Sequence, residues 1–97
     1  MDMTNNQKEE IWVMLELAYM PIALKNDRYN GKDFLKVAFS LLDTINASNP
    51  DIDRISVATV MTDYFNEKLD PKMDAVQYNG FIKFLSEGRK DILNFMN

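Results

Sequence analysis

The side chains that most often carry enzyme chemistry are missing from this sequence. Its 97 residues contain no Cys and no His, which removes thiol nucleophiles, thiolate metal ligands and the commonest general base. Any reaction would have to use carboxylates and amines. A chain of this length buries only about two-thirds of the surface that it exposes when unfolded, which leaves little room for a deep catalytic cleft. We therefore expect a protein that is not an enzyme and that takes no cofactor and no small-molecule substrate.

Three aspartates could in principle hold a hard metal ion. Asp51 and Asp53 flank Ile52, and Asp63 follows further along the chain. Mg²⁺ and Ca²⁺ prefer such oxygen ligands, but the twelve-residue pattern of a calcium-binding loop is absent. Acidic residues in the first turn of a helix also stabilise the helix dipole. Because this second explanation is the simpler one, we expect no metal site.

A group of basic and aromatic residues near the C-terminal end is the strongest candidate for a binding site. The group consists of Tyr78, Lys83, Arg89, Lys90 and Phe95. Residues 1–71 hold 7 basic and 12 acidic side chains, a net charge of −5, whereas residues 72–97 hold 4 and 3, a net charge of +1. Arginine and aromatic side chains supply much of the energy of protein interfaces. The group could therefore recognise an acidic or amphipathic partner, although a solvated helix face would explain the same residues.

Residues 11–20 are apolar around more of a helix than one core-facing side requires. Such an excess is typical of a contact surface, but it would also suit a helix that is the most buried in the fold. Trp12 and Tyr19 could therefore belong to the core or to a contact. A transmembrane helix needs about 20 apolar residues, whereas this run is much shorter and includes Glu16. We expect neither a membrane span nor a signal peptide.

The apolar residues recur at helical spacing and predict an all-α fold. Thr4 and Gln7 have the spacing of a capping box, and Asn30 is a typical N-cap. Asn49-Pro50 and Asp70-Pro71 each place a capping residue before a proline, which is a common way to begin a helix. These signals predict four helices that begin near residues 4, 30, 49 and 70.

Two further residues interrupt the predicted helices. Pro21 should end or kink the first helix, because proline cannot donate the backbone hydrogen bond. Gly88 either marks a close helix contact or splits the last helical region in two. With short connections between them, four amphipathic helices predict an antiparallel up-down bundle. We expect one domain over residues 1–97, with the last helix broken near Gly88 if the second alternative holds.

The order of these features resembles the enterocin A type immunity proteins, which protect producers of pediocin-like (class IIa) bacteriocins from their own peptide. The first part of the resemblance is carried by Asp33-Phe34-Leu35-Lys36-Val37, Asn49-Pro50 and Asp53-Arg54-Ile55. The second part is carried by Tyr64-Phe65-Asn66-Glu67-Lys68-Leu69, Gln77-Tyr78 and Phe81-Ile82-Lys83-Phe84-Leu85-Ser86-Glu87-Gly88-Arg89. The resemblance spans nearly the whole chain.

The resemblance implies a cytoplasmic four-helix bundle without catalytic activity, acting at the inner face of the cell membrane of a Gram-positive bacterium. Such a protein confers resistance to an antimicrobial peptide by binding the bacteriocin together with its membrane receptor of the mannose phosphotransferase type. The C-terminal half of the family's members largely sets which bacteriocins are countered. In this sequence that half includes residues 77–97, the segment that the charge distribution also singles out. We expect a monomer.

A second class of protein would have a similar composition. A small acidic phage or mobile-element inhibitor could bind and block a host enzyme or a defence protein. If it mimicked a nucleic acid, its carboxylates would line one face, whereas here the acidic residues gather at predicted helix starts. A sequence pI near 4.7 also argues against nucleic acid as a partner, because phosphate binding needs a basic face.

Overall fold

The computed structural model describes residues 3–94 of the chain. Within these residues it contains four α-helices, one short 3₁₀ helix and no strand. The elements are α1 (Asn5–Lys25), α2 (Gly31–Ser48), α3 (Arg54–Lys68), α4 (Ala75–Ser86) and the 3₁₀ helix η1 (Lys90–Asn94). The predicted all-α fold with four helices is confirmed.

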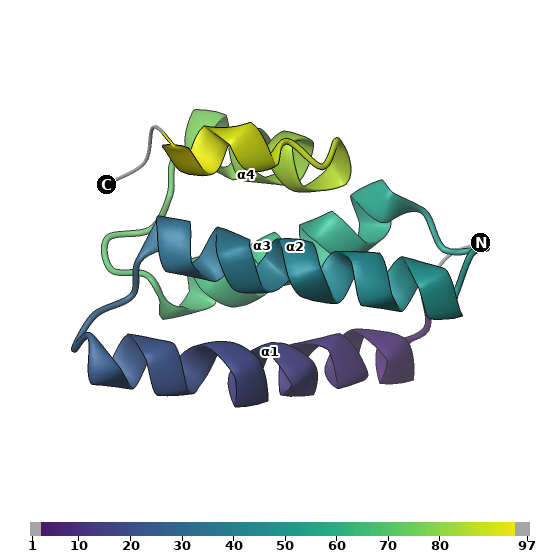
Figure 1. Ribbon diagram of the computed structural model, residues 1–97, viewed down its shortest axis with the longest axis horizontal. Coiled ribbons are helices and arrows are strands. Elements are labelled where there is room, and N and C mark those ends of the chain that lie inside the picture. The colour runs from purple at the N-terminus through teal and green to yellow at the C-terminus, as the bar shows by residue number, and fades with distance from the viewer. Residues whose placement is uncertain (1–2, 95–97) are drawn as a thin grey trace.

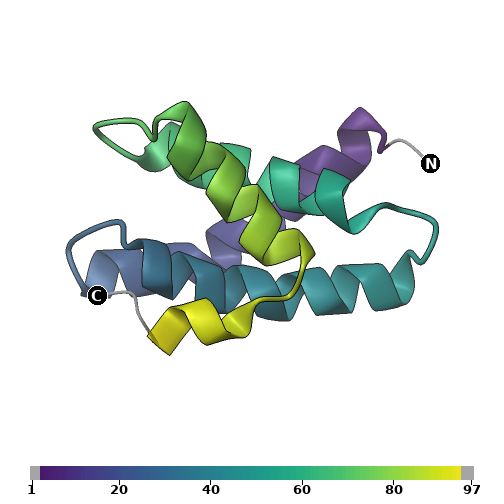
Figure 2. The same cartoon turned by 90° about the horizontal axis from the view of Figure 1, so that it is seen from above.

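The helices lie in three layers (Figure 1). α1 forms one outer layer, α2 and α3 form the middle layer, and α4 with η1 forms the other outer layer. Both middle helices contact α1 and α4, whereas α1 and α4 have no close backbone contact in the described part of the chain. Consecutive helices run in opposite directions, as the predicted up-down bundle requires, so α1 and α3 run in the same direction. Seen from above, α1 and α4 cross α2 obliquely (Figure 2).

Two predicted helix starts are confirmed by their caps. The Thr4 hydroxyl accepts a hydrogen bond from the backbone N–H of Gln7 at 3.1 Å, and the Gln7 side chain accepts one from the backbone N–H of Thr4 at 2.8 Å. The predicted capping box is therefore formed. At the start of α2, the side-chain oxygen of Asn30 accepts from the backbone N–H groups of Lys32 and Asp33. These bonds satisfy N–H groups that a helix leaves without partners.

The prediction that Asn49-Pro50 opens the third helix is wrong, because α3 begins at Arg54 with Asp53 as its N-cap. Asn49 closes α2 instead. Its backbone N–H and its side-chain amide both donate to the carbonyl of Ile45, at 2.9 and 3.1 Å. The chain then turns and buries Ile52. Capping of the preceding helix and burial of an apolar side chain thus outweigh the local start signal.

The prediction that Asp70-Pro71 opens the fourth helix is also wrong. The N-cap of α4 is Asp74, whose carboxylate accepts from the backbone N–H of Gln77 at 2.8 Å in a second capping box. The residues before it serve the end of α3. The Lys72 ammonium group donates to the carbonyls of two residues near that end, at 2.8 and 2.6 Å. Lys72 thereby satisfies carbonyls that the end of a helix leaves exposed.

α1 does not end at Pro21 but continues to Lys25. Of the two alternatives predicted there, an end or a kink, the end is therefore wrong. Proline removes the N–H that would bond to the carbonyl of Leu17. Both residues are exposed, and water can satisfy a carbonyl on that side. Ala23, beyond the proline, is buried and continues the core-facing stripe of α1.

The last helical region is split at Gly88. α4 ends at Ser86, and Gly88 has φ +67°, in the left-handed region that favours glycine. The backbone N–H groups of Gly88 and Arg89 donate to the carbonyls of Leu85 and Phe84, at 3.1 and 3.0 Å. These bonds close α4 before the chain forms η1. Of the two sequence-based alternatives, the break is the correct one.

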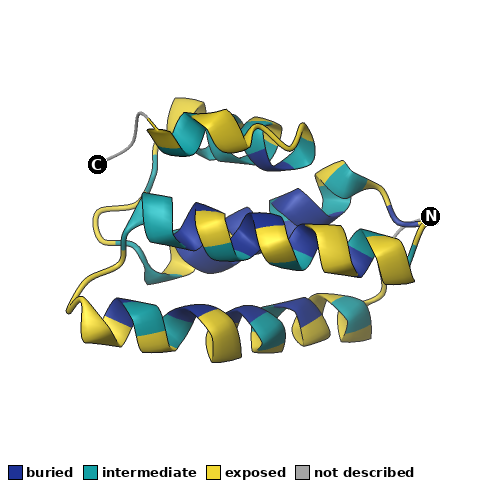
Figure 3. Cartoon of the chain, in the orientation of Figure 1, coloured by how far each residue is buried: buried dark blue, intermediate teal, exposed yellow. Residues whose placement is uncertain are grey.

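The buried side chains form one apolar cluster that joins the three layers (Figure 3). α1 contributes a stripe of buried residues spaced four apart: Ile11, Leu15, Tyr19 and Ala23. Aromatic rings link the other helices. The ring centroids of Phe34 and Phe65 lie 4.6 Å apart, and those of Phe65 and Phe81 lie 5.7 Å apart. Tyr19 meets the Phe34 ring edge-on at 5.4 Å, so this aromatic group includes residues of all four helices.

The outward side of α1 is also apolar. Val13, Leu17 and Leu24 are 57%, 74% and 72% exposed, and their spacing places them on one side of the helix. α1 has four buried residues and α3 has seven, so α1 is not the most buried helix. Tyr19 belongs to the core, and Trp12 is half-buried. Within residues 3–94, none of the helices combines the length and the hydropathy that a membrane crossing requires.

Candidate functional site

The structure distributes the candidate partner-binding residues over α4 and the segment that follows it. Tyr78 and Lys83 lie in α4, Arg89 lies in the loop after it, and Lys90 is the first residue of η1. The three cations are exposed and Tyr78 is half-buried. Phe95 lies outside the described residues. The candidate residues that the structure describes therefore share one outer layer of the fold.

Two of the three cations already have acidic partners. The Lys90 ammonium group lies 3.2 Å from the carboxylate of Asp43 in α2. The Arg89 guanidinium lies 3.6 Å from the carboxylate of Asp91 and 5.6 Å from the centre of the Phe84 ring. Exposed ion pairs of this kind contribute at most about 1 kcal/mol each. Lys83 takes part in no ion pair within the described residues, which makes it the cation most available to a partner.

Arg54 is a structural residue that the sequence reasoning missed. Its Nε donates to the carbonyl of Ser86 at the end of α4, at 2.9 Å. Its Nη1 donates to Asn46 Oδ1 at 3.4 Å and lies 3.6 Å from the Asp43 carboxylate. Arg54 thus joins α2, α3 and the end of α4. A sequence signal was present, because a cation in the first turn of a helix opposes the helix dipole and so suggests a partner elsewhere.

Tyr78 is attached to α3 rather than free for a partner. Its hydroxyl donates to the carboxylate of Asp63 at 2.5 Å. This hydrogen bond, together with partial burial, raises the pKa of Tyr78 to about 12. The hydroxyl therefore stays protonated at neutral pH and fixes the first turns of α4 against α3.

A second tyrosine joins α1 to α3. The Tyr64 hydroxyl donates to the Glu16 carboxylate at 2.5 Å, and burial together with this hydrogen bond raises the pKa of Tyr64 well above its usual value. One turn earlier on α1, the Trp12 ring N–H donates to the carbonyl of Val60 at 3.1 Å. The rings of Trp12 and Tyr64 meet edge-on with their centres 5.5 Å apart. The sequence did not reveal these contacts, because each hydrogen bond joins residues 48 positions apart and the two rings are further apart still in the chain.

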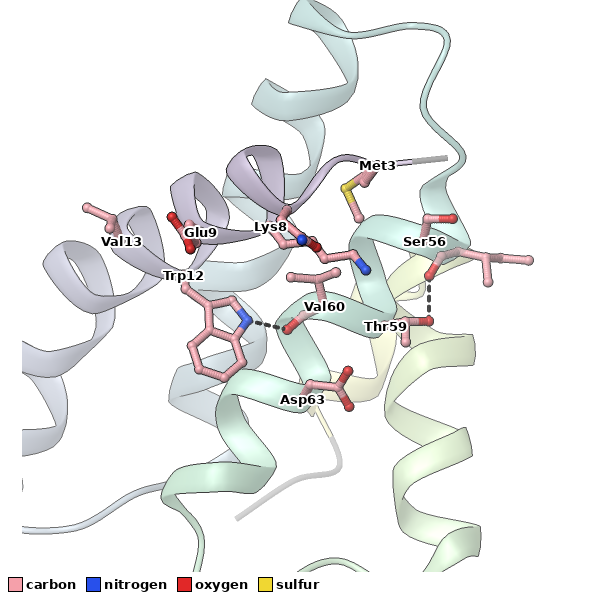
Figure 4. A pocket seen from close by; sticks show the side chains of 11 residues that line it. Met3, Lys8, Glu9, Trp12, Val13, Ser56, Thr59, Val60 and Asp63 are labelled. Carbon is pink, nitrogen blue, oxygen red and sulfur yellow. Dashed lines mark hydrogen bonds between the residues drawn. The ribbon is translucent and has the colours of Figure 1, made fainter. Parts of the chain in front are cut away.

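An open groove of about 1020 Å³ lies between the N-terminal halves of α1 and α3. Trp12 and Val60 both line it, and there the Trp12 ring N–H meets the backbone carbonyl of Val60 (Figure 4). Val13 and Ile55, which are 57% and 63% exposed, also line it. Sequence analysis identified the apolar excess of the first helix but not this groove, because its second wall comes from α3.

The acidic residues do not gather into a metal site in the part of the chain that the structure describes. Asp53 is the N-cap of α3 and makes no side-chain capping hydrogen bond. Asp63 lies further along the same helix and accepts the hydrogen bond from Tyr78. What the described surface offers is exposed charge on one outer layer and an apolar groove between α1 and α3.

Comparison of the chain with protein-family models, with curated proteins and with solved structures finds no match in any of the three. A function therefore has to be inferred from the residues, the fold and the resemblance of the sequence motifs. The surface features on which such an inference can draw are the exposed cations Lys83 and Arg89 and the apolar groove beside Trp12.

Proposed function

We propose that this protein is an immunity protein of the kind that its motifs resemble. It protects a Gram-positive cell from a pediocin-like bacteriocin. It does so by binding the bacteriocin, together with its receptor of the mannose phosphotransferase type, from the cytoplasmic side of the membrane. The resemblance supplies the identity of the partner, and the fold supplies the support described next.

The observation that carries the proposal is where the resembling motifs fall in the fold. Residues 33–37 lie in the first turns of α2, and residues 53–55 open α3. Residues 64–69 cover the end of α3, and residues 81–89 cover the end of α4 and the break at Gly88. These segments thus lie at or near helix ends, in the order in which the motifs follow one another along the chain. Asn49-Pro50 is the exception, because it closes α2 and does not open α3.

The proposed mechanism is occlusion by binding, which requires no reaction. Lys83 and Arg89 present positive charge on the outer layer formed by α4 and the loop after it. Arg89 also lies over the Phe84 ring, so the same surface offers an apolar component to a partner. Lys90 has a different part in this mechanism, because its ion pair with Asp43 attaches the C-terminal segment to α2.

Copurification tests this proposal. A tagged copy of the chain is expressed in a sensitive strain that carries the mannose transporter, and the membranes are solubilised with and without prior exposure to a bacteriocin that the chain counters. We expect the transporter to copurify with the chain only after exposure. Copurification that is equal without the peptide would contradict binding to the receptor-bound bacteriocin. Absence of the transporter in both samples would contradict the receptor as partner.

Lys83→Glu tests the assigned surface. Lys83 is exposed and has no ion pair within the described residues. Its charge stabilises the last turn of α4, so the variant should lose at most about 1 kcal/mol of stability and stay folded while it loses copurification. Arg28→Glu is the matched control, because it makes the same charge change at an exposed residue in the loop between α1 and α2. Equal retention of the transporter by both variants would contradict the assignment of the binding surface to α4.

A further inference from the structure

The groove between α1 and α3 is lined in part by apolar side chains that are exposed to solvent. Ile55 and Val13 are 63% and 57% exposed on its two walls. The half-buried Trp12 ring also lines the groove and is held by its hydrogen bond to Val60 and its edge-on contact with Tyr64. A groove whose aromatic side chain is already held in place can receive apolar side chains without first rearranging. Pre-formed sites of this kind lose less entropy on binding.

Carboxylates flank this apolar strip on both walls. Glu9 lines the groove from α1, and Asp63 lines it from α3 near Trp12 (Figure 4). Neither carboxylate takes part in an ion pair within residues 3–94. One oxygen of Asp63 accepts the hydrogen bond from Tyr78, and the carboxylate keeps its negative charge for a cation of the partner. Lys8 is the one cation among the lining residues that the structure describes, and Glu16 lies one turn beyond Trp12. The groove is therefore an apolar strip with acidic edges, in a chain whose net charge is −4.

We propose that this groove binds an amphipathic helix of a partner protein, with Lys or Arg on both sides of its apolar stripe. A helix laid between two helices inserts apolar side chains at i, i+3 or i+4 and i+7, and these would pack on Trp12, Val13 and Ile55. The flanking cations would pair with Glu9 and Asp63. This inference concerns a surface that contains none of the candidate residues of the C-terminal region, and it stands whether or not the proposed function holds.

A second copy of this chain fits the groove less well. A symmetric contact through the groove would bring Glu9 and Asp63 of one copy towards the same carboxylates of the other. Like charges in an interface are unfavourable. Charge complementarity therefore favours a cationic occupant over self-association, and the oligomeric state distinguishes the two.

The chain contains its own reporter for this site, because Trp12 is its only tryptophan. The probe is a tryptophan-free synthetic peptide of leucine and lysine at helical spacing, titrated while the fluorescence of Trp12 is recorded. A peptide with glutamate in place of lysine and a peptide with the same residues in scrambled order are the controls. We expect a saturable change in emission with the leucine-lysine helix alone.

Two variants and their matched controls locate the binding. Ile55→Ser should weaken binding by about tenfold, as expected for loss of a buried aliphatic side chain. Leu24→Ser changes an apolar residue outside the groove that is 72% exposed, against 63% for Ile55, and it should leave binding unchanged. Glu9→Gln combined with Asp63→Asn should weaken binding by roughly threefold to tenfold at low salt. Glu87→Gln is the charge control, because Glu87 is exposed and lies beyond the end of α4.

Three results would overturn the proposal. The first is a Trp12 signal that does not saturate or that is equal for the glutamate and scrambled peptides. The second is a loss of affinity in Leu24→Ser as large as the loss in Ile55→Ser, because the peptide would then bind apolar surface in general. The third is a dimer in sedimentation equilibrium that Ile55→Ser dissociates, because the occupant would then be a second copy of the chain.

Discussion

Replacing glycine by alanine should have opposite effects at Gly88 and Gly80. Gly88 has φ +67°, and a Cβ there would meet an Arg54 guanidinium nitrogen at 3.7 Å, an ordinary contact distance. Gly88→Ala therefore adds no steric clash, and its cost is that of holding an L-residue in the left-handed conformation, about 1–2 kcal/mol. Gly80 lies within α4, and a Cβ there would lie 3.9 Å from the Phe84 ring. Gly80→Ala should stabilise the fold by up to about 1 kcal/mol, because alanine favours the helix.

Urea unfolding and thermal melting followed by circular dichroism measure both changes. For a domain of this size, 1 kcal/mol shifts the melting temperature by about 4–8 °C. Gly88→Ala should melt lower than the wild type and Gly80→Ala should melt higher. Gly88→Asn is the control, because asparagine enters the left-handed region more readily than alanine. This account of the break after α4 would be refuted if Gly88→Ala were as stable as the wild type. It would also be refuted if both alanine variants shifted the melting temperature in the same direction.

Three other substitutions test single contacts. The fold raises the pKa of Tyr78 from its ordinary value of 10.0 to about 12. The stability that the protonated hydroxyl contributes is therefore complete below about pH 10. It is lost as the pH rises towards 12, because the unfolded chain releases this proton first. Tyr78→Phe should therefore lose less stability than the wild type between pH 9 and 11, and equal losses in their urea midpoints would contradict this. Arg54→Lys should lower the free energy of unfolding, measured in urea, by about 1 kcal/mol, because an ammonium group cannot reproduce the guanidinium contacts with Ser86 and Asp43. Unchanged stability would contradict the role of Arg54 in holding α2, α3 and the end of α4 together. Lys90→Glu should lower stability by about 0.5 kcal/mol, because it places a second carboxylate beside Asp43. Unchanged stability in Lys90→Glu would contradict the pairing.

The parts of the fold that could be predicted from the sequence depend on contacts within a few residues. The capping box at Thr4 and the cap at Asn30 involve hydrogen bonds that are local in the chain. The break at Gly88 is also a local backbone feature, but the sequence left it as one of two alternatives. The helical spacing of apolar residues also gave the correct fold class. Local patterns of this kind are readable because their partners lie within one or two turns.

The errors occurred where a local signal competed with the rest of the fold. Asn49-Pro50 has the form of a helix start, but Asn49 caps the preceding helix and Ile52 is buried. Pro21 has the form of a helix end, but burial of Ala23 keeps α1 continuous on the core side. The hydrogen bonds of Asn49 to Ile45 are local, but the burial of Ile52 and Ala23 depends on tertiary contacts that no window of the sequence contains.

The candidate site was predicted only in part, for the same reason. Charge counting pointed to Lys83, Arg89 and Lys90, but it could not show that Lys90 pairs with Asp43 of α2, 47 residues earlier. The groove beside Trp12 needs both α1 and α3 for its walls. Sequence periodicity gave the apolar excess of α1 and left open whether that excess was buried.

The central claim is protection, and a survival assay tests it most directly. The chain is expressed in a sensitive Gram-positive strain that carries the mannose transporter, and killing curves are recorded with a panel of pediocin-like peptides and with an unrelated pore-forming peptide as control. The account predicts that cells expressing the chain survive one or a few of the pediocin-like peptides and remain sensitive to the control. Undiminished killing by every peptide of a broad panel, with the folded protein present in the cells, would contradict it.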